Sequence, residues 1–534
     1  MPFVWHKWLL TFHLPPGARQ AMERWSLRLA WVILFLLLFT GVPLFLCMPL
    51  YADVTAFDLC ARNLFRGGIH YRDAFDYGLP GMVWLHAGIR AALGWRPEVM
   101  RLVDFLVVAI CTGLLVLWLQ SQGLKRPALA WTAVVLFTFY LATPEVCHSQ
   151  RDMWMLLPAL AALHMRCRRV SAVLGSSMAS WRVAVLAGIE GLFWGIAFWI
   201  KPFVAIPGLV CWLLTVVQIW RGSAQAGRVL AADLAGLFAG GLLAALSGIA
   251  WLWSAGSWPF FLDTLFNWDY DYYRFATNGP LWRAGFLLKQ FPPWGWIHLP
   301  AFVIAVWAIG RALVRPAFPK AAVHSGLWQE ALLAGFYLGW LVQANYLQYG
   351  FLYHLAPACI LALAVVAGRR WLPGDSPLGW IILAGFLTIA VVRHPLIDFE
   401  RTALWARCCR EGSSPDVQNR LTLSTEPRRP DWVALARVAV FLQELGLRDG
   451  ELTCYSFGTI PLYLQLDLKP STRFVYAIEE MITLNPLRQD IIRAELAASQ
   501  QRYVVTDLQF LAADLQVAGV LQPRAQESGS GLKL

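Results

Sequence analysis

Residues 29–49, LAWVILFLLLFTGVPLFLCMP, contain no charged side chain. A helix of about 20 apolar residues is long enough to span the hydrocarbon core of a bilayer. Further runs of this kind follow along the chain. The sequence therefore predicts a polytopic α-helical membrane protein with about eleven spans, at 29–49, 98–119, 128–144, 153–165, 183–200, 203–220, 229–252, 294–312, 327–344, 351–367 and 378–393.

Charged residues divide the chain into two parts. They make up about 11% of residues 1–393 and about 23% of residues 394–534, and a soluble domain typically has about 25%. We expect a cytoplasmic segment at 1–28, a membrane domain at 29–393 and a soluble domain at 394–534. The formal charge is +13 before residue 394 and −2 after it, so the basic pI reflects loops between spans and does not indicate nucleic-acid binding.

The positions of Lys and Arg predict the orientation. With the N-terminus in the cytoplasm, 17 of the 29 basic residues before position 394 fall in short inner segments, as the positive-inside rule requires. An odd number of spans then places residues 394–534 outside the cytoplasm, and the predicted location is the plasma (inner) membrane. Residues 80–93 are too short for a span, and we expect a helix on the outer membrane surface.

Residues 394–534 alternate between helix and strand patterns. We expect helices at 430–446 and 485–498 and strands at 451–456, 473–477 and 502–506, which favours a small α/β domain. The cysteines show no metal-binding spacing, and we expect no disulfide framework.

The outer loop at 50–96 carries the first candidate site residue. Asp53 follows the first span within a few residues. A carboxylate at the membrane edge can take a proton from an acceptor hydroxyl or hold a divalent metal ion. The alternative is a solvated loop acid.

This loop resembles the first outer loop of the GT-C glycosyltransferases, in particular the branch of protein mannosyltransferases and aminoarabinose transferases. The matching residues are Asp53, Phe57, Ala61, Arg62, Leu64, Gly67, Gly68, Tyr71 and Asp73. Val54 stands where many members have a second acid. The resemblance implies a GT-C-like arrangement of spans and makes Asp53 a catalytic residue, with Arg62 at the donor phosphate and with Tyr71 and Asp73 near the sugar or acceptor.

Three later stretches extend the resemblance: HSQRDMWMLLPALAAL (148–163), WGIAFWIKPFVAIPGL (194–209) and QYGFLYHLAPACILAL (348–363). They imply Asp152 as a second site acid, and Arg151, Lys201 and His354 as contacts of the lipid phosphate. A divalent ion, Mg²⁺ or Mn²⁺, held by Asp53 and Asp152 is left open. Lys201 could equally be a lysine that extends to the membrane interface, and His354 an interfacial residue.

The aromatic loop at 260–279 is a second candidate region. It places Trp268 and Tyr272 beside Asp269. Aromatic rings and acids bind sugar faces and hydroxyls, but they also form interfacial belts.

The resemblance implies an inverting glycosyltransferase that moves a sugar from a polyprenyl-phosphate donor to an acceptor hydroxyl outside the cytoplasm. The acceptor could be a glycan, a lipid or a protein. The alternative is a transporter or flippase of a lipid-linked or amphiphilic substrate. Such folds typically contain internal repeats, and we find none in the sequence.

Overall fold

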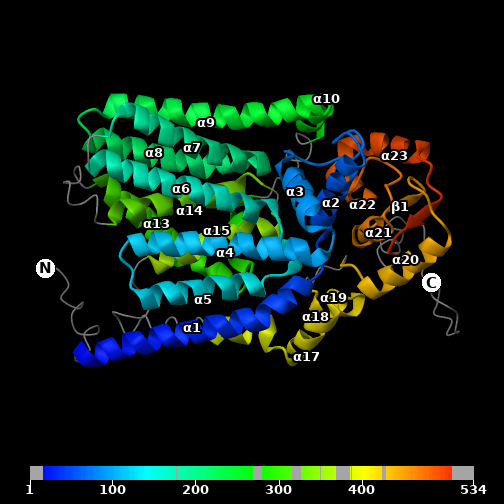
Figure 1. Cartoon of the computed structure of the whole chain (residues 1–534), viewed down its shortest axis with the longest axis horizontal. Coiled ribbons are helices and arrows are strands. Elements are labelled where there is room, and N and C mark those ends of the chain that lie inside the picture. The colour runs from blue at the N-terminus through cyan, green and yellow to red at the C-terminus, as the bar shows by residue number, and fades with distance from the viewer. Residues whose placement is uncertain are drawn as a thin grey trace.

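The computed structural model describes residues 16–175, 178–268, 279–314, 326–348, 350–368, 385, 388–423 and 429–507. Long helices in this part of the chain run side by side in one bundle (Figure 1). They are α1 (Pro16–Cys47), α4 (Pro97–Ser121), α5 (Arg126–Ala142), α6 (Arg151–Gly175), α7 (Ser180–Ile200), α8 (Ala205–Gly222), α9 (Ala226–Ser254), α13 (His298–Val314), α14 (Leu327–Tyr346) and α15 (Leu355–Ala367).

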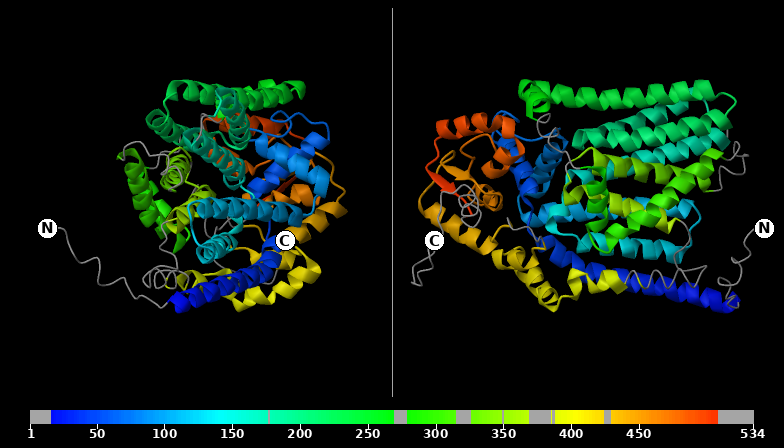
Figure 2. Two further views of the ribbon diagram at one scale, coloured as in Figure 1. Left: turned by 60° about the vertical axis from the view of Figure 1, so that its left-hand side comes forward. Right: turned by 180° about the vertical axis from the view of Figure 1, so that it is seen from behind.

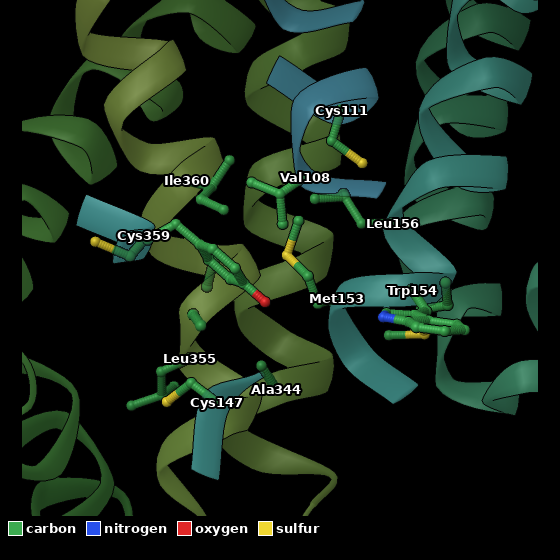
Figure 3. Packing of buried hydrophobic residues seen from close by; sticks show 14 of the residues in the cluster. Val108, Cys111, Cys147, Met153, Trp154, Leu156, Ala344, Leu355, Cys359 and Ile360 are labelled. Carbon is green, nitrogen blue, oxygen red and sulfur yellow. The ribbon is translucent and has the colours of Figure 1, made fainter. Parts of the chain in front are cut away.

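Among the described residues, six helices are long and apolar enough to cross a membrane. The protein is therefore helical and embedded in a membrane. The helices coincide with ten of the predicted spans, whereas most of the eleventh, 378–393, lies outside the described residues. Side chains of α4, α6, α14 and α15 interlock in the bundle core, where Val108, Met153 and Ile360 are almost fully buried (Figure 3).

Helices α7 and α9 pack closely because glycines face each other. A Cβ atom at Gly240 would overlap the carbonyl oxygen of Gly188, and one at Gly191 would overlap that of Leu237. Small residues let helix backbones approach in this way in membranes.

Helix α6 is longer than the predicted span at 153–165. It continues to Gly175 through Arg166 and Arg169, which pair with acids of the neighbouring helices. Arg166 lies 2.7 Å from Glu190 of α7, and Arg169 lies 2.5 Å from Asp233 of α9. All four side chains are buried, and the mutual pairing allows the polar turn to stay inside the bundle.

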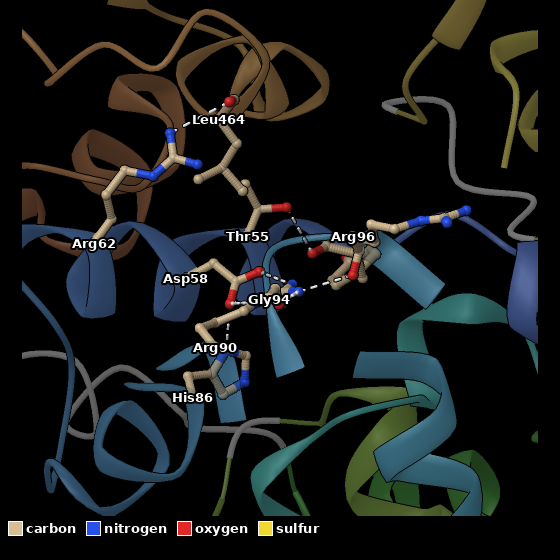
Figure 4. A network of polar contacts seen from close by, with 9 residues as sticks. Thr55, Asp58, Arg62, His86, Arg90, Gly94, Arg96 and Leu464 are labelled. Carbon is tan, nitrogen blue, oxygen red and sulfur yellow. Dashed lines mark hydrogen bonds and ion pairs between the residues drawn. The ribbon is translucent and has the colours of Figure 1, made fainter. Parts of the chain in front are cut away.

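The outer loop forms two helices, α2 (Ala52–Phe65) and α3 (Gly81–Leu93). Helix α3 confirms the expected helix at 80–93, and both helices lie at one end of the bundle (Figure 1). Buried Asp58 of α2 accepts hydrogen bonds from Arg90 of α3 at 2.5 and 2.9 Å and lies 2.8 Å from His86 Nδ1 (Figure 4). Burial opposes ionisation, but His86 and Arg90 outweigh it and hold the pKa of Asp58 below its usual value.

Residues after the bundle form short helices and one small sheet at the same end as α2 and α3 (Figures 1 and 2). The helices are α17 (Phe399–Ala403), α18 (Trp405–Glu411), α19 (Pro415–Leu421), α20 (Trp432–Glu444), α21 (Pro461–Gln465), α22 (Ile478–Leu484) and α23 (Gln489–Ala498). Strands β1 (Leu452–Cys454) and β2 (Tyr503–Val505) pair in parallel, which confirms two of the three expected strands.

The expected strand at 473–477 is wrong. This segment forms only an isolated bridge, between Phe474 and Phe75 of the outer loop, and the Phe75 amide donates to the Arg473 carbonyl at 2.8 Å. The segment 473–477 therefore pairs with the outer loop. Among the described residues, the sheet consists of β1 and β2 alone.

Buried His70 should make the stability of the folded protein depend on pH. Burial lowers the pKa of His70 to about 3, so the folded protein keeps it neutral, whereas the unfolded chain binds a proton below about pH 6.5. Stability should therefore fall as the pH falls, by about 2 kcal/mol between pH 7 and 5 from this residue. We expect His70→Phe to remove that part of the pH dependence in denaturant unfolding of the detergent-solubilised protein. An unchanged slope in the variant would contradict this assignment.

Candidate functional site

A cavity of about 250 Å³ lies where the bundle, the outer loop and the C-terminal segments meet. Four of the predicted site residues, from four separate stretches of sequence, line it. The wall consists of Tyr51, Asp53, Phe57, Tyr77, Val146, Gln150, Arg151, Lys201, Gln348, Phe351, Leu352, Tyr353, His354, Phe457, Tyr476, Glu480 and Leu484.

Asp53 occupies the first turn of α2, where the helix dipole favours a carboxylate. The side chain is half-buried. Gln150 donates to its Oδ2 atom at 3.3 Å. Tyr51, just before the helix, packs against Phe457 with ring centroids 5.1 Å apart. Asp53, which was predicted close to the outer end of the first span, thus lies on the cavity wall.

Lys201 follows the last residue of α7, where Pro202 starts a short 3₁₀ turn, Pro202–Val204. Its Nζ atom lies 2.6 Å from Oδ2 of Asp152. Asp152 is fully buried at the start of α6 and also accepts a hydrogen bond from Gln348 at 3.3 Å. Asp152 therefore lies behind the cavity wall, where it can position Lys201 and Gln348.

His354 lies at the end of the 3₁₀ turn Leu352–His354, immediately before α15. Its Nε2 atom is 3.9 Å from Oδ2 of Asp152. The neighbouring Tyr353 ring lies 5.8 Å from the Lys201 Nζ atom and stacks against Phe351. A histidine and a lysine thus share one carboxylate at the same side of the cavity.

Arg151 is held by the outer loop. It donates to both carboxylate oxygens of Asp76, at 2.6 and 2.8 Å, and to the Tyr77 carbonyl. Tyr476, from the C-terminal segments, donates to Asp76 at 2.8 Å. Burial raises the pKa of Asp76, although Arg151 and Tyr476 oppose the shift. The network fixes the guanidinium of Arg151 on the cavity wall.

The arrangement of the carboxylate oxygens does not fit a metal ion shared by Asp53 and Asp152. The Lys201 ammonium already occupies the cation position beside Asp152, and a divalent ion requires several oxygen ligands. Among the described residues, no group of three or more His, Cys, Asp or Glu side chains forms a metal-binding arrangement.

Other predicted residues lie away from this cavity. Arg62 pairs with Asp467 at 2.8 Å, and Asp73 accepts hydrogen bonds from Arg72 and the Ile69 amide. Tyr71 is fully buried and donates to the Gly78 carbonyl.

Trp268, which was predicted to contact sugar, ends a π-helical turn at Thr264–Trp268. It packs against Phe75 and Phe474 and is 2% exposed. It is therefore a packing residue at the seam between the outer loop and the C-terminal segments. Asp269 and Tyr272 lie outside the described residues.

Several cavity residues were not among the predicted site residues. Gln150 directly precedes Arg151, so the stretch at 148–163 could have suggested it. Tyr476 and Glu480 come from the C-terminal segments, and only the fold brings them to Asp53.

Two apolar grooves flank the half of α7 that leads to Lys201. One, of about 420 Å³, lies among α7, α8 and α9, and the other, of about 620 Å³, among α3, α7 and α9. Trp199 lines both grooves, two residues before Lys201. The grooves therefore approach the polar cavity along the chain, where Ile200 of the second groove directly precedes Lys201 of the cavity wall.

No protein-family model matches the chain, and no curated protein matches it.

Proposed function

We propose that the protein is an inverting glycosyltransferase that moves a sugar from a polyprenyl-phosphate donor to an acceptor hydroxyl outside the cytoplasm. One observation supports this most strongly. A half-buried carboxylate, Asp53, shares a small cavity with three groups that can bind phosphate, Arg151, Lys201 and His354. This is the set of charges that sugar transfer from a phosphate leaving group requires.

In the proposed reaction, Asp53 takes the proton of the acceptor hydroxyl. The hydroxyl oxygen attacks the anomeric carbon from the face opposite the phosphate, and the bond between sugar and phosphate oxygen breaks as the new bond forms. The anomeric configuration inverts, and polyprenyl phosphate leaves. Lys201, His354 and Arg151 stabilise the negative charge that develops on the departing phosphate.

The surroundings of the charges suit a lipid-linked sugar. Tyr51 and Phe457 on one part of the wall, and Tyr77 and Tyr476 on another, offer aromatic faces that pack against sugar rings. The apolar grooves along α7 could receive the polyprenyl chain, with its phosphate at Lys201. Asp152 is in this scheme a positioning residue for Lys201.

We further propose that the N-terminus is cytoplasmic and that the cavity opens on the outer face of the plasma membrane. The basic inner segments support this orientation. A membrane-borne donor also fits a compartment that has no nucleotide-sugar pool.

The experiment is a transfer assay with the full-length protein in proteoliposomes. Radiolabelled polyprenyl-phosphate mannose and arabinose are offered with a membrane extract that contains endogenous acceptors. We expect label on an acceptor from at least one lipid donor and none from the matching nucleotide sugars. Movement of intact donor across the bilayer without any transfer would instead favour a flippase.

A further inference from the structure

A second cleft, of about 360 Å³, lies at the seam between the end of α2, the outer loop and the C-terminal segments. We call it the basic cleft. It is separate from the central cavity and shares no wall residue with it. Its wall consists of Leu59, Arg62, Asn63, Arg66, Arg72, Asp73, Ala74, Leu468, Lys469, Pro470, Ser471, Thr472, Arg473 and Val475.

Basic side chains outnumber acids on this wall. It contains five basic side chains and one acid, Asp73, which pairs with Arg72 at 2.7 Å, and Arg473 pairs with Glu495 behind the wall at 2.9 Å. Arg62 and Arg66 do pair with Asp467, at 2.8 and 2.9 Å, but that side chain is 71% exposed. An ion pair with so exposed a carboxylate contributes little and is easily exchanged for another anion.

Two donors in the wall have no hydrogen-bond acceptor among the described residues. The Nδ2 atom of Asn63 is buried without a partner, and the whole residue is only 8% exposed. The Nη1 atom of Arg66 makes no hydrogen bond either, although it forms a longer ion pair with Asp449 at 3.6 Å. Buried donors usually have acceptors, so the Asn63 Nδ2 atom indicates a missing acceptor in the cleft.

We propose that the basic cleft binds a phosphate group. Guanidinium groups match phosphate oxygens with paired hydrogen bonds, and Lys469 adds a point charge. The phosphate can belong to a free anion or to a lipid headgroup, since both present the same oxygens. The proposal does not depend on the glycosyltransferase assignment.

The cleft lies within reach of the central cavity along one helix. Asp53 is in the first turn of α2 and Arg62 in its last turn. They are nine positions apart, which corresponds to about 14 Å along the helix axis. A phosphate-bearing molecule held in the basic cleft would therefore lie about 14 Å from Asp53 along α2.

The test measures thermal unfolding of the full-length protein in detergent while inorganic phosphate replaces chloride at constant ionic strength. A second arm uses nanodiscs of neutral lipid with and without phosphatidic acid. We expect a saturable rise in Tm in at least one arm. Asn63→Asp places a negative charge among the cations without changing the side-chain shape, and Lys469→Gln removes a cation. Each variant should weaken the apparent affinity roughly tenfold or more.

Arg437→Gln is the matched control, because Arg437 is an exposed cation on α20 and does not line the cleft. It should respond like the wild type. A response to phosphate alone identifies a soluble anion, and a response only to phosphatidic acid identifies a lipid headgroup. No saturable response in either arm would overturn the proposal. So would a response that Asn63→Asp and Lys469→Gln leave intact, or one that only Lys201→Met abolishes.

Discussion

Asp53→Asn should reduce sugar transfer by roughly 10²–10⁴-fold, the range expected for loss of a general base. The amide has the shape of the carboxylate and can still accept the hydrogen bond from Gln150, so the protein should remain folded. Initial rates in proteoliposomes measure the effect. Asp490→Asn is the matched control, because Asp490 is fully exposed on α23, and it should retain the wild-type rate.

Transfer that survives in a folded Asp53→Asn protein would exclude Asp53 as the base. Among the described residues, Glu480 would then be the remaining carboxylate on the cavity wall, because Asp152 lies behind that wall and is paired with Lys201.

Lys201→Met should both destabilise the protein and abolish transfer. The substitution leaves the Asp152 carboxylate buried without its cation, and breaking a buried ion pair in this way costs about 3–5 kcal/mol. The double variant Asp152→Asn, Lys201→Met removes both charges and should recover most of that stability. It should not recover transfer, because the ammonium that would stabilise the leaving phosphate is still absent. Tm values and transfer rates of both variants, in one detergent, separate the two effects.

Recovery of transfer in the double variant would show that Lys201 acts only by neutralising Asp152. If Lys201→Met alone were as stable as the wild type, that result would contradict a stabilising ion pair between Lys201 and Asp152.

The membrane helices could be predicted because their signal is local. Each apolar run specifies its own helix, and the positions of Lys and Arg predict the orientation of the set. The extension of α6 could not be predicted in this way. Arg166 and Arg169 resemble the end of a span in the sequence, and only their pairing with Glu190 and Asp233, on later helices, keeps them inside the bundle.

The site was partly predictable for the same reason. Four site residues each follow or begin an apolar run: Asp53, Arg151, Lys201 and His354. All four were therefore predicted to lie at the same end of the bundle. Arg62 lies outside the cavity wall and pairs with Asp467, about 400 residues later in the chain, a contact that no local pattern indicates. The C-terminal part of the wall, with Tyr476 and Glu480, depends on the bridge between Phe75 and Phe474, which no local pattern indicates.

Photo-cross-linking of the donor tests whether the cavity is the donor site, and it needs no knowledge of the acceptor. Phe351, on the cavity wall, is replaced by a photoreactive benzoyl-phenylalanine, and the protein is irradiated with radiolabelled polyprenyl-phosphate sugar. We predict labelling at this position that excess unlabelled polyprenyl phosphate suppresses, and none at Phe441, which is 51% exposed on α20. Equal labelling at both positions, or labelling at Phe351 that the competitor leaves unchanged, would contradict the cavity as the donor site.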